Sequence, residues 1–305
     1  MSYTLRIRRF LGAPWPNKVH GIRYQFKRAW SRVLPSVPLP VWLPYGGWWM
    51  AGDDVCDDAV FTGNFEVSER RFLQWFLKPG MTVLDIGAHH GFYTMLAARR
   101  VGPTGRVISF EPSHRERKRL LVHLRLNHIL DRVSVFPIAL GRETAEATLY
   151  VVVGRDTGCN SLRPPAVTEP TQPVKVSVTS LDTFLAQQNV TRVDFIKMDV
   201  EGAELGVVQG AEELLGRRHR PVILAELTDS RTLPWGYSAS AIYDSLAVKG
   251  YRWFAITHDG KLCACPRTDQ FGTNLVAFPS ERVAETIAFH ESLEIEGRPS
   301  APLRS

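Results

Sequence analysis

Short apolar runs alternate with segments of helical periodicity through the middle of this 305-residue chain. The runs are typical of buried strands, and the segments between them carry apolar residues three or four positions apart, as amphipathic helices do. Strands are expected at 81–86, 106–111, 133–138, 194–199 and 221–227. Because a helical segment follows most of these strands, the pattern predicts an α/β fold whose parallel strands are covered by helices on both faces.

The alternation is interrupted between the third and fourth strands. Two β-rich runs, 147–153 and 173–181, flank a polar loop, 154–172, that contains several prolines. Loops of this length inside a compact domain are usually functional. We therefore expect a hairpin-like insertion over 142–180 whose loop reaches toward the active site. Two later runs, 251–257 and 274–279, are expected to close the sheet.

The first 60 residues differ in composition from the rest of the chain. Residues 1–52 contain eight of the 37 lysines and arginines and none of the 31 acidic residues. Four prolines between residues 33 and 50 exclude a continuous transmembrane helix there. We expect an irregular extension with a basic helix around 20–32. It is interpreted as a solvated basic arm or a coat on the main domain, with peripheral contact to an acidic membrane through 1–50 as the alternative.

These features divide the chain into a basic, Trp- and Pro-rich extension (1–60), a catalytic domain (61–282, with the insertion at 142–180) and a C-terminal tail (283–305). Four scattered cysteines suit neither a disulfide framework nor a zinc site, so a reducing compartment is expected. The N-terminus lacks the apolar core of a secretory signal peptide. The predicted location is cytoplasmic, with attachment at the inner membrane surface as an alternative.

The stretch VLDIGAHHGFYT (83–94) places a glycine turn between the first strand and its helix, where α/β folds bind nucleotides. Counted from Gly87, the dinucleotide fingerprint G-x-G-x-x-G requires glycines at 89 and 92, but the chain has His89 and Phe92. Without a glycine at 89 the backbone cannot easily approach a pyrophosphate. The spacing therefore disfavours a NAD-dependent oxidoreductase and favours a nucleoside ligand without a phosphate, such as S-adenosyl-L-methionine (SAM).

Three features near this turn suit SAM. Free N–H groups at the start of the helix, near Gly91, favour a carboxylate. Asp85, at the end of the strand, can accept a hydrogen bond from the ammonium group. Glu111, 24 residues after Gly87 and at the end of the second strand, can accept hydrogen bonds from both ribose hydroxyls. The alternative for Glu111 is a charge that stabilises the start of the next helix.

The strings VLDIGAHHGFYT, FEP and FIKMDVEGAE, with SLDTFL upstream of the last, resemble the FkbM-type family of SAM-dependent methyltransferases. The resemblance covers roughly residues 64–228 and extends more weakly to about 279. It implies a Rossmann-like, doubly wound, mostly parallel seven-stranded sheet. It also implies methyl transfer, usually to a hydroxyl group on a sugar, glycolipid or polyketide-type product.

The resemblance also assigns cofactor-binding residues by position. His89 stands where the family commonly has Asn, in a G-A-N-x-G pattern, so the detail of that contact is expected to differ. Asn127, Ala139 and Leu140 match positions near the adenine edge. The residues expected to bind SAM are Asp85, Gly87, Ala88, His89, Gly91, Thr94, Glu111, Asn127, Ala139, Leu140 and Asp199.

A hydroxyl acceptor needs a general base beside the methyl donor. The string DVEGAE, at the end of the fourth strand, supplies Asp199, Glu201 and Glu204, which match the signature acids of the family, and Glu226 ends the fifth strand. The candidate catalytic residues are Asp199, Glu201 and Glu226. A salt bridge with Lys197 is the structural alternative for Asp199, and charge stabilisation of a helix start is the alternative for Glu204. Grouped carboxylates can also hold a divalent cation, but no resident metal is expected.

The predicted function is SAM-dependent O-methylation of a saccharide, glycolipid or secondary-metabolite hydroxyl by in-line transfer with a carboxylate base. The alternatives are a nucleic-acid methyltransferase that uses the basic arm and a membrane-docked, non-catalytic scaffold. The chain lacks the N/D-P-P-Y/F-type string of amino-methyltransferases, so nucleic acid is not expected as a partner. The expected partner is a small-molecule or glycan acceptor, and homo-oligomer formation is left open.

Overall fold

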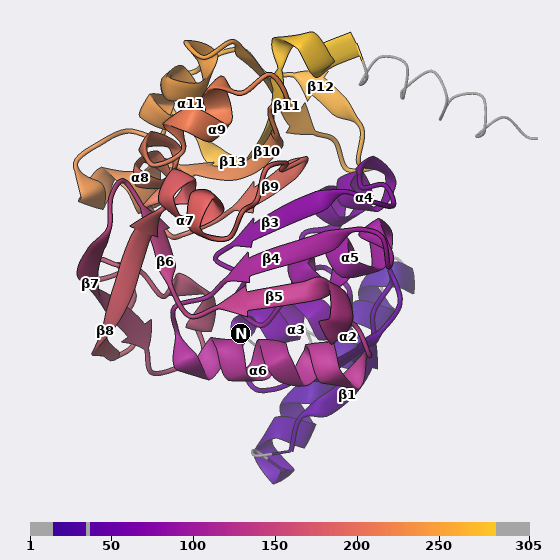
Figure 1. Cartoon of the computed structure of the whole chain (residues 1–305). Helices are drawn as coiled ribbons and strands as arrows, with labels where there is room; N and C mark the ends of the chain where they lie inside the picture. Colours follow the sequence, from indigo (N-terminus) through magenta and orange to yellow (C-terminus); the bar gives the residue numbers. More distant parts are fainter. Residues whose placement is uncertain (1–14, 35–36, 285–305) are drawn as a thin grey trace, which may run out of the picture.

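The computed structural model describes residues 15–34 and 37–284, and an eight-stranded sheet forms its centre (Figure 1). The strands are β3 Thr82–Ile86, β4 Arg106–Phe110, β5 Val133–Phe136, β9 Phe195–Met198, β10 Val222–Thr228, β11 Tyr251–Ile256, β12 Leu262–Ala264 and β13 Gly272–Pro279. Their order is β12-β11-β13-β10-β9-β3-β4-β5. The strands from β10 to β5 are parallel, whereas β13 runs antiparallel to both β10 and β11.

The sheet confirms the predicted α/β, doubly wound architecture. All five predicted parallel strands and both closing strands are present. The sheet has eight strands rather than seven because β12 pairs with the free edge of β11. Successive side chains along a strand point to opposite faces, so Val83 enters one hydrophobic core and Leu84 enters the other.

Helices cover both faces of the sheet (Figure 1). One core includes residues of α4 Val67–Phe76, α5 Phe92–Val101 and α6 His114–Leu126. The other includes residues of α7 Leu181–Gln187, α8 Glu204–Gln209, α9 Glu212–Gly216 and α11 Ser240–Ala247. Parallel strands buried on both sides in this way read as continuous apolar runs, which is the pattern seen in the sequence.

The insertion forms a separate three-stranded sheet of order β6-β8-β7. Its strands are β6 Ala139–Gly141, β7 Ala145–Val152 and β8 Thr171–Ser180. The antiparallel pairing of β7 with β8 confirms the predicted hairpin. Strand β6, which pairs in parallel with β8, was not predicted, because three residues are too few to show a period. The connecting loop contains the 3₁₀ turn η2 Thr157–Cys159.

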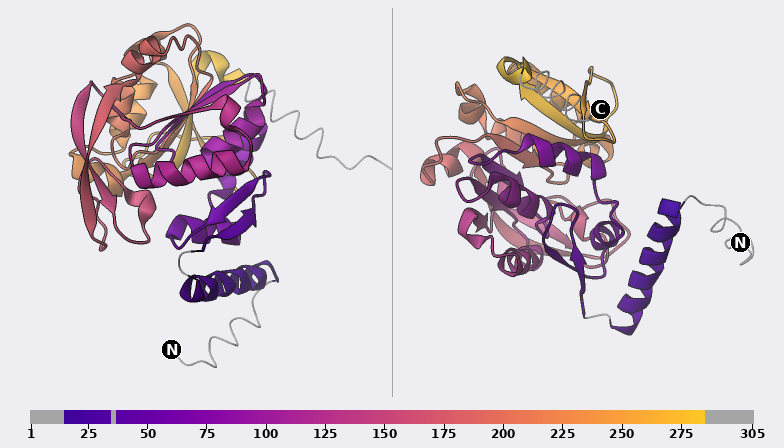
Figure 2. Two further views of the ribbon diagram at one scale, coloured as in Figure 1. Left: turned by 60° about the horizontal axis from the view of Figure 1, so that its bottom comes forward. Right: turned by 90° about the vertical axis from the view of Figure 1, so that its right-hand side faces the viewer.

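The N-terminal extension is more regular than predicted. It contains α2 Trp15–Val33, which includes the expected basic helix, a hairpin of β1 Leu39–Trp42 and β2 Trp48–Ala51, and α3 Val55–Thr62. The hairpin forms despite the prolines because Gly46 and Gly47, both with positive φ, make its turn. Helix α2 stands apart from the central sheet (Figure 2). None of the helices in the described ranges is both long and apolar enough to cross a membrane. Most of the predicted tail, from residue 285 on, lies outside the described residues.

Candidate active site

A cavity of about 280 Å³ lies where the carboxyl ends of β3, β4, β9 and β10 meet. The chain passes from β3 to β4 and β5 on one side, and from β9 to β10 on the other, so the strand order reverses between β3 and β9. Open α/β sheets bind their ligands outside the carboxyl ends of the strands at such a reversal. The position alone therefore makes this cavity the candidate site.

The glycine turn after β3 forms the floor of the cavity. A side chain at Gly87 is excluded, because a Cβ would lie 1.9 Å from the carbonyl oxygen of Asp199 and φ is +78°. His89 also has a positive φ, +49°. Asn and His are among the residues that tolerate this conformation best. The departure from the family's Asn at this position therefore keeps the backbone shape of the turn.

The carboxylate of Glu111 holds this turn to the end of β4. Its Oε2 accepts a hydrogen bond from the backbone N–H of His89 at 2.8 Å, and its Oε1 accepts one from Ser113 at 2.8 Å. Burial, and secondarily the neighbouring Glu116, raise the pKa of Glu111 to about 7. A carboxylate has about four acceptor positions, so Glu111, which lines the cavity, can accept further hydrogen bonds from a ligand.

The three predicted catalytic carboxylates meet at one wall of the cavity. One oxygen each from Asp199, Glu201 and Glu226 lies within 4.8 Å of the others. Asp199 Oδ2 lies 3.3 Å from the ammonium of Lys197, and Glu201 Oε2 lies 2.9 Å from Arg231 Nε. Each of these two carboxylates therefore has a cationic neighbour.

Glu226 differs from the other two carboxylates. Its Oε2 is buried and has no hydrogen-bond partner among the described residues. Burial raises the pKa of Glu226 to about 8, and the negative charge of Asp199 contributes to the rise. A pKa in this range is close to that of groups used in general acid–base catalysis.

Lys197 is a cavity residue that the sequence suggested only as an ion-pair partner. Its Nζ lies 3.3 Å from both the carbonyl oxygen of Gly87 and Asp199 Oδ2, and 5.2 Å from the ring centre of Tyr93. Burial alone would lower the pKa of Lys197, but Asp199 and Asp85 outweigh burial and raise it. The lysine is therefore a fixed positive charge that joins the glycine turn to the end of β9.

Glu204 supports the turn that carries Glu201. Its Oε1 accepts hydrogen bonds from the N–H groups of Val200, at 2.9 Å, and Gly202, at 3.3 Å. Both Glu201 and Gly202 have positive φ, +55° and +101°. The side chain of Glu204 thus stabilises an unusual backbone turn, and that turn directs Glu201 at the cavity. This explains physically why the D-V-E-G-x-E string ends in an acidic residue.

Three predicted SAM contacts lie behind the cavity wall. Asp85 is 1% exposed, and its Oδ2 accepts a hydrogen bond at 2.5 Å from the hydroxyl of Thr94. At Gly91 a Cβ would lie 2.2 Å from Leu120 Cδ1, so this glycine serves the packing of α5 against α6. None of the three is a lining residue, whereas Ala88, Ala139 and Leu140 do line the cavity.

The structure corrects the prediction that Asn127 lies at the adenine edge. Asn127 follows the end of α6 and does not line the cavity. Its side chain accepts a hydrogen bond from the N–H of Trp48 at 2.7 Å and donates one to the carbonyl oxygen of Trp48 at 2.8 Å. It therefore fixes the N-terminal hairpin to the domain. Sequence position alone could not separate these two roles.

Two segments outside the sheet contribute further lining residues that sequence reasoning missed. The N-terminal segment supplies Cys56 and Glu66, and the insertion loop supplies Thr157 and Ser161. The insertion loop therefore reaches the site, as predicted. Val55 N–H donates to the carbonyl oxygen of Arg155 at 3.0 Å, so the two segments also contact each other. These residues lie in loops, at helix ends or in short helices, where hydrophobic periodicity does not distinguish individual positions.

The lining fits SAM in three respects. The backbone of the glycine turn, at Gly87 and Ala88, lines the cavity, and Glu111 offers free acceptor positions for hydroxyls. The apolar side chains Phe110, Ile138 and Leu140 line the same cavity and suit a flat base.

Comparison with known proteins also identifies methyltransferases. The model of the "Methyltransferase FkbM domain" matches residues 85–253. Methyltransferase 1 of Beauveria bassiana is 28% identical over 168 residues, which are 49% of this chain and 65% of that protein. The 2-O-methyltransferase NoeI of Sinorhizobium fredii is 24% identical over 192 residues, 58% of this chain and 75% of that protein.

Two further matches are weaker: one covers little of the other protein, and the other has a low TM-score. The AMB antimetabolite synthetase AmbE of Pseudomonas aeruginosa is 26% identical over 208 residues, which are 57% of this chain and 10% of that protein. The chain thus spans a tenth of AmbE and 65% of Methyltransferase 1. An O-methyltransferase of Bacillus cereus, solved in complex with SAH, has a TM-score of 0.41 at 16% identity and covers 69% of this chain and 80% of that one.

Proposed function

We propose that this chain, which belongs to the FkbM family of SAM-dependent methyltransferases, methylates a hydroxyl group of a small-molecule or glycan acceptor. The matched region includes the glycine turn, Glu111 and all three cavity carboxylates. The family supplies the reaction class and the cofactor. The choice of oxygen as the methylated atom, and the role of each residue, are our proposals.

The cofactor would be held between the glycine turn and the end of β4. Glu111 would accept hydrogen bonds from the ribose hydroxyls through its free acceptor positions. The backbone at Gly87 and Ala88 would contact the amino-acid portion, and Ala139 with Leu140 would pack on the base. Asp85 and Thr94 would act indirectly, because they lie beneath the turn and hold its shape. When bound, SAM supplies an electrophilic methyl group.

The residues of the chain would then orient the acceptor and accept its proton. We assign the general base to Glu226. Asp199 and Glu201 each form an ion pair with a cationic side chain, whereas Glu226 forms no ion pair among the described residues. With a pKa of about 8, Glu226 is mostly protonated at pH 7, and its ionised form, which accepts the hydroxyl proton, increases as the pH rises toward 8. Asp199 and Glu201 would orient the acceptor hydroxyls through hydrogen bonds.

The observation that carries this proposal is the convergence of three carboxylates within 4.8 Å beside the glycine turn. Oxygen nucleophiles need a base, since a neutral hydroxyl attacks poorly. A second support is the relative NoeI, which is a 2-O-methyltransferase. The same carboxylates could instead hold a divalent cation, so the assay should be run with and without a chelator.

The test is methyl transfer from SAM with an isotopically labelled methyl group to separate panels of sugars, glycolipids, phenols, amines and RNA. Product mass spectrometry then locates the label. We expect label on oxygen, and we expect Glu226→Gln to lower kcat by about 10²–10⁴-fold while SAM affinity, measured by calorimetry, stays unchanged. Glu213→Gln, at an exposed position on α9, is the matched control. Label on nitrogen or carbon, or full activity of Glu226→Gln, would contradict the proposal.

A further inference from the structure

Helix α2 carries an exposed apolar stripe. Ile22, Phe26, Ala29 and Val33 recur at helical spacing and therefore share one face. Ile22 is 57% exposed, Phe26 53% and Val33 76%. Large apolar side chains that line one face of a helix and remain in solvent mark a binding surface more often than scattered single residues do.

The face of α2 next to the stripe contacts helix α3, and these contacts set the direction in which the stripe points. The ammonium of Lys27 is buried and pairs with Asp58 on α3. The guanidinium of Arg23 lies 6.0 Å from the ring centre of Phe61, also on α3. Helix α2 nevertheless projects from the body of the molecule (Figure 2). The ring of Phe26 also stacks on that of Phe61, with 6.4 Å between the ring centres, but Phe26 remains half exposed. The stripe is thus held on a projecting helix, and its large apolar side chains remain accessible.

The charge around the stripe indicates what it binds. Arg28 and Arg32 lie on the side of the stripe away from Arg23 and Lys27, as the helical repeat requires. No acidic residue occurs anywhere in residues 1–52. Trp42 and Trp48, which follow in the hairpin, are exposed as well. Basic residues beside apolar side chains, with exposed tryptophans, are the composition of helices that lie in a membrane interface.

Other occupants fit less well. A second copy of the chain would bring two acid-free, basic segments together, and like charges oppose that contact. A nucleic acid would satisfy the arginines but would leave the apolar stripe in water. An anionic lipid surface satisfies both, since its acyl boundary takes the apolar side chains and its headgroups take the arginines.

We propose that α2 docks this protein on an anionic membrane, with the stripe Ile22, Phe26, Ala29 and Val33 in the boundary between headgroups and acyl chains. Helix α3, on which α2 packs, supplies the cavity residues Cys56 and Val60. Docking through α2 would therefore hold the N-terminal wall of the cavity near the lipid surface. The proposal does not depend on the methyltransferase activity.

Flotation with phosphatidylglycerol–phosphatidylcholine vesicles and with pure phosphatidylcholine vesicles tests the proposal on the full chain. We expect flotation with the anionic vesicles only, and weaker flotation at high salt. Ile22→Asp/Val33→Asp should lower binding at least about tenfold. Arg28→Gln/Arg32→Gln should lower it by roughly tenfold or more, because each basic residue contributes separately.

Val248→Asp is the matched control, since Val248 is 84% exposed at the end of α11, far along the chain from the stripe. It should float like the unmodified protein. Circular dichroism and thermal unfolding establish that the variants are folded. Absence of flotation with anionic vesicles would overturn the proposal. Equal loss in Val248→Asp would overturn it too, as would a dimer in solution that Ile22→Asp/Val33→Asp dissociates without any vesicle binding.

Discussion

Glu111 is the residue whose predicted role can be tested most directly. Its two oxygens already accept hydrogen bonds from the backbone N–H groups of His89 and Ser113. A glutamine at this position has only one oxygen, so its NH₂ group would face one of these N–H donors. The substitution would therefore disturb the glycine turn as well as remove acceptor positions for the ligand.

We expect Glu111→Gln to weaken SAM binding by at least about tenfold, because a hydrogen bond to a charged group contributes roughly 1.5–3 kcal/mol. Isothermal titration calorimetry measures the change. Glu143→Gln, on the exposed surface, should bind SAM like the unmodified protein. Unchanged affinity of Glu111→Gln would show that Glu111 supports the turn without contacting the ligand.

For single residues, the sequence located some of those that line the cavity and misplaced others, for physical reasons. Gly87 and Glu111 were identifiable because each stands at a fixed distance from a strand end. Asn127 was not, because a residue at a helix end can face either the ligand or another segment, and here it holds Trp48. Lys197 was noted as an ion-pair partner, but its place in the cavity depends on the pairing of β9 with β3.

At the scale of elements, the extension and the insertion are joined by one buried carboxylate. Asp58, on α3, pairs with Lys27 of α2 and with Arg155 of the insertion loop. Lys27 is 1% exposed. Both α3 and the insertion loop supply residues to the cavity. Asp58 therefore links the three segments that cover the cavity, in addition to the backbone hydrogen bond between Val55 and Arg155.

We expect Asp58→Asn to lower the free energy of unfolding by about 3–5 kcal/mol, because it leaves the buried ammonium of Lys27 without a counter-charge. Lys27→Met/Asp58→Asn should be less destabilised than Asp58→Asn alone, since it removes that ammonium. Denaturant unfolding measures both. Asp131→Asn, which removes a surface pair with Arg132, is the control and should change little. A double variant no more stable than Asp58→Asn would contradict this account.

Helices and strands could be predicted where the hydrophobic pattern extends over many residues, and not where it covers only a few. The buried strands and their helices each showed apolar runs or helical spacing, so the parallel part of the sheet followed from the sequence. The β1–β2 hairpin does not follow from the sequence pattern, because its prolines disfavour strands and its turn depends on Gly46 and Gly47. The edge strand β12 has three residues, too few for a pattern.

For the molecule as a whole, several buried carboxyls make stability depend on pH. Burial raises the pKa of Glu66, Glu111 and Glu204 to about 7 and that of Glu226 to about 8. In the unfolded chain these groups titrate near 4.3. Between these values the native state holds more protons than the unfolded state, so stability falls as pH rises.

Buried histidines act in the opposite direction, but only at lower pH. Burial lowers the pKa of His89 and His123 to about 4, so between pH 4 and about 6.5 the unfolded state binds more protons at these two histidines, and their contribution to stability rises with pH. Above about pH 6.5 these histidines are neutral in the native state and mostly neutral in the unfolded state. Between about pH 6.5 and 8 the four carboxyls therefore outweigh the two histidines.

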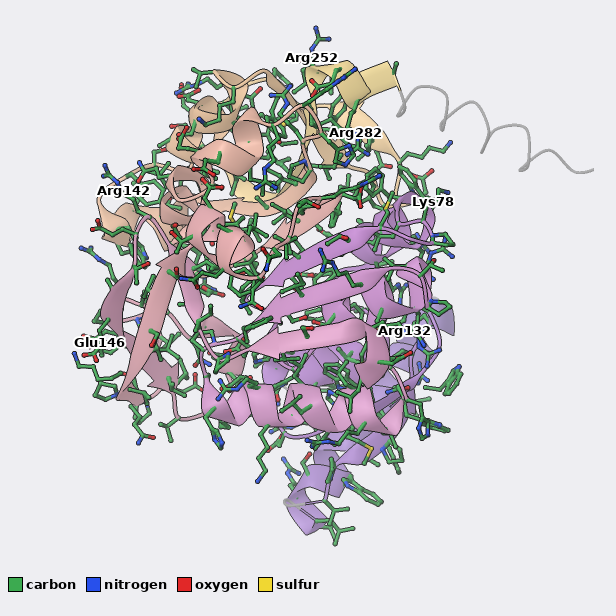
Figure 3. All side chains as sticks on the ribbon, in the orientation of Figure 1. Lys78, Arg132, Arg142, Glu146, Arg252 and Arg282 are labelled. Carbon is green, nitrogen blue, oxygen red and sulfur yellow. The ribbon has the colours of Figure 1, made fainter. Side chains whose placement is uncertain are left out.

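We expect the free energy of unfolding to fall between about pH 6.5 and 8, by an amount on the order of 1.4 kcal/mol for each pKa unit involved. Denaturant unfolding at several pH values measures this slope. Glu204→Gln should reduce the slope, because its oxygen can still accept from Val200 and Gly202 while its titration is removed. Glu146→Gln, at a position that points outward from β7 (Figure 3), should leave the slope unchanged. A stability that is flat or rises over this range would show that the buried carboxyls are already ionised in the native protein.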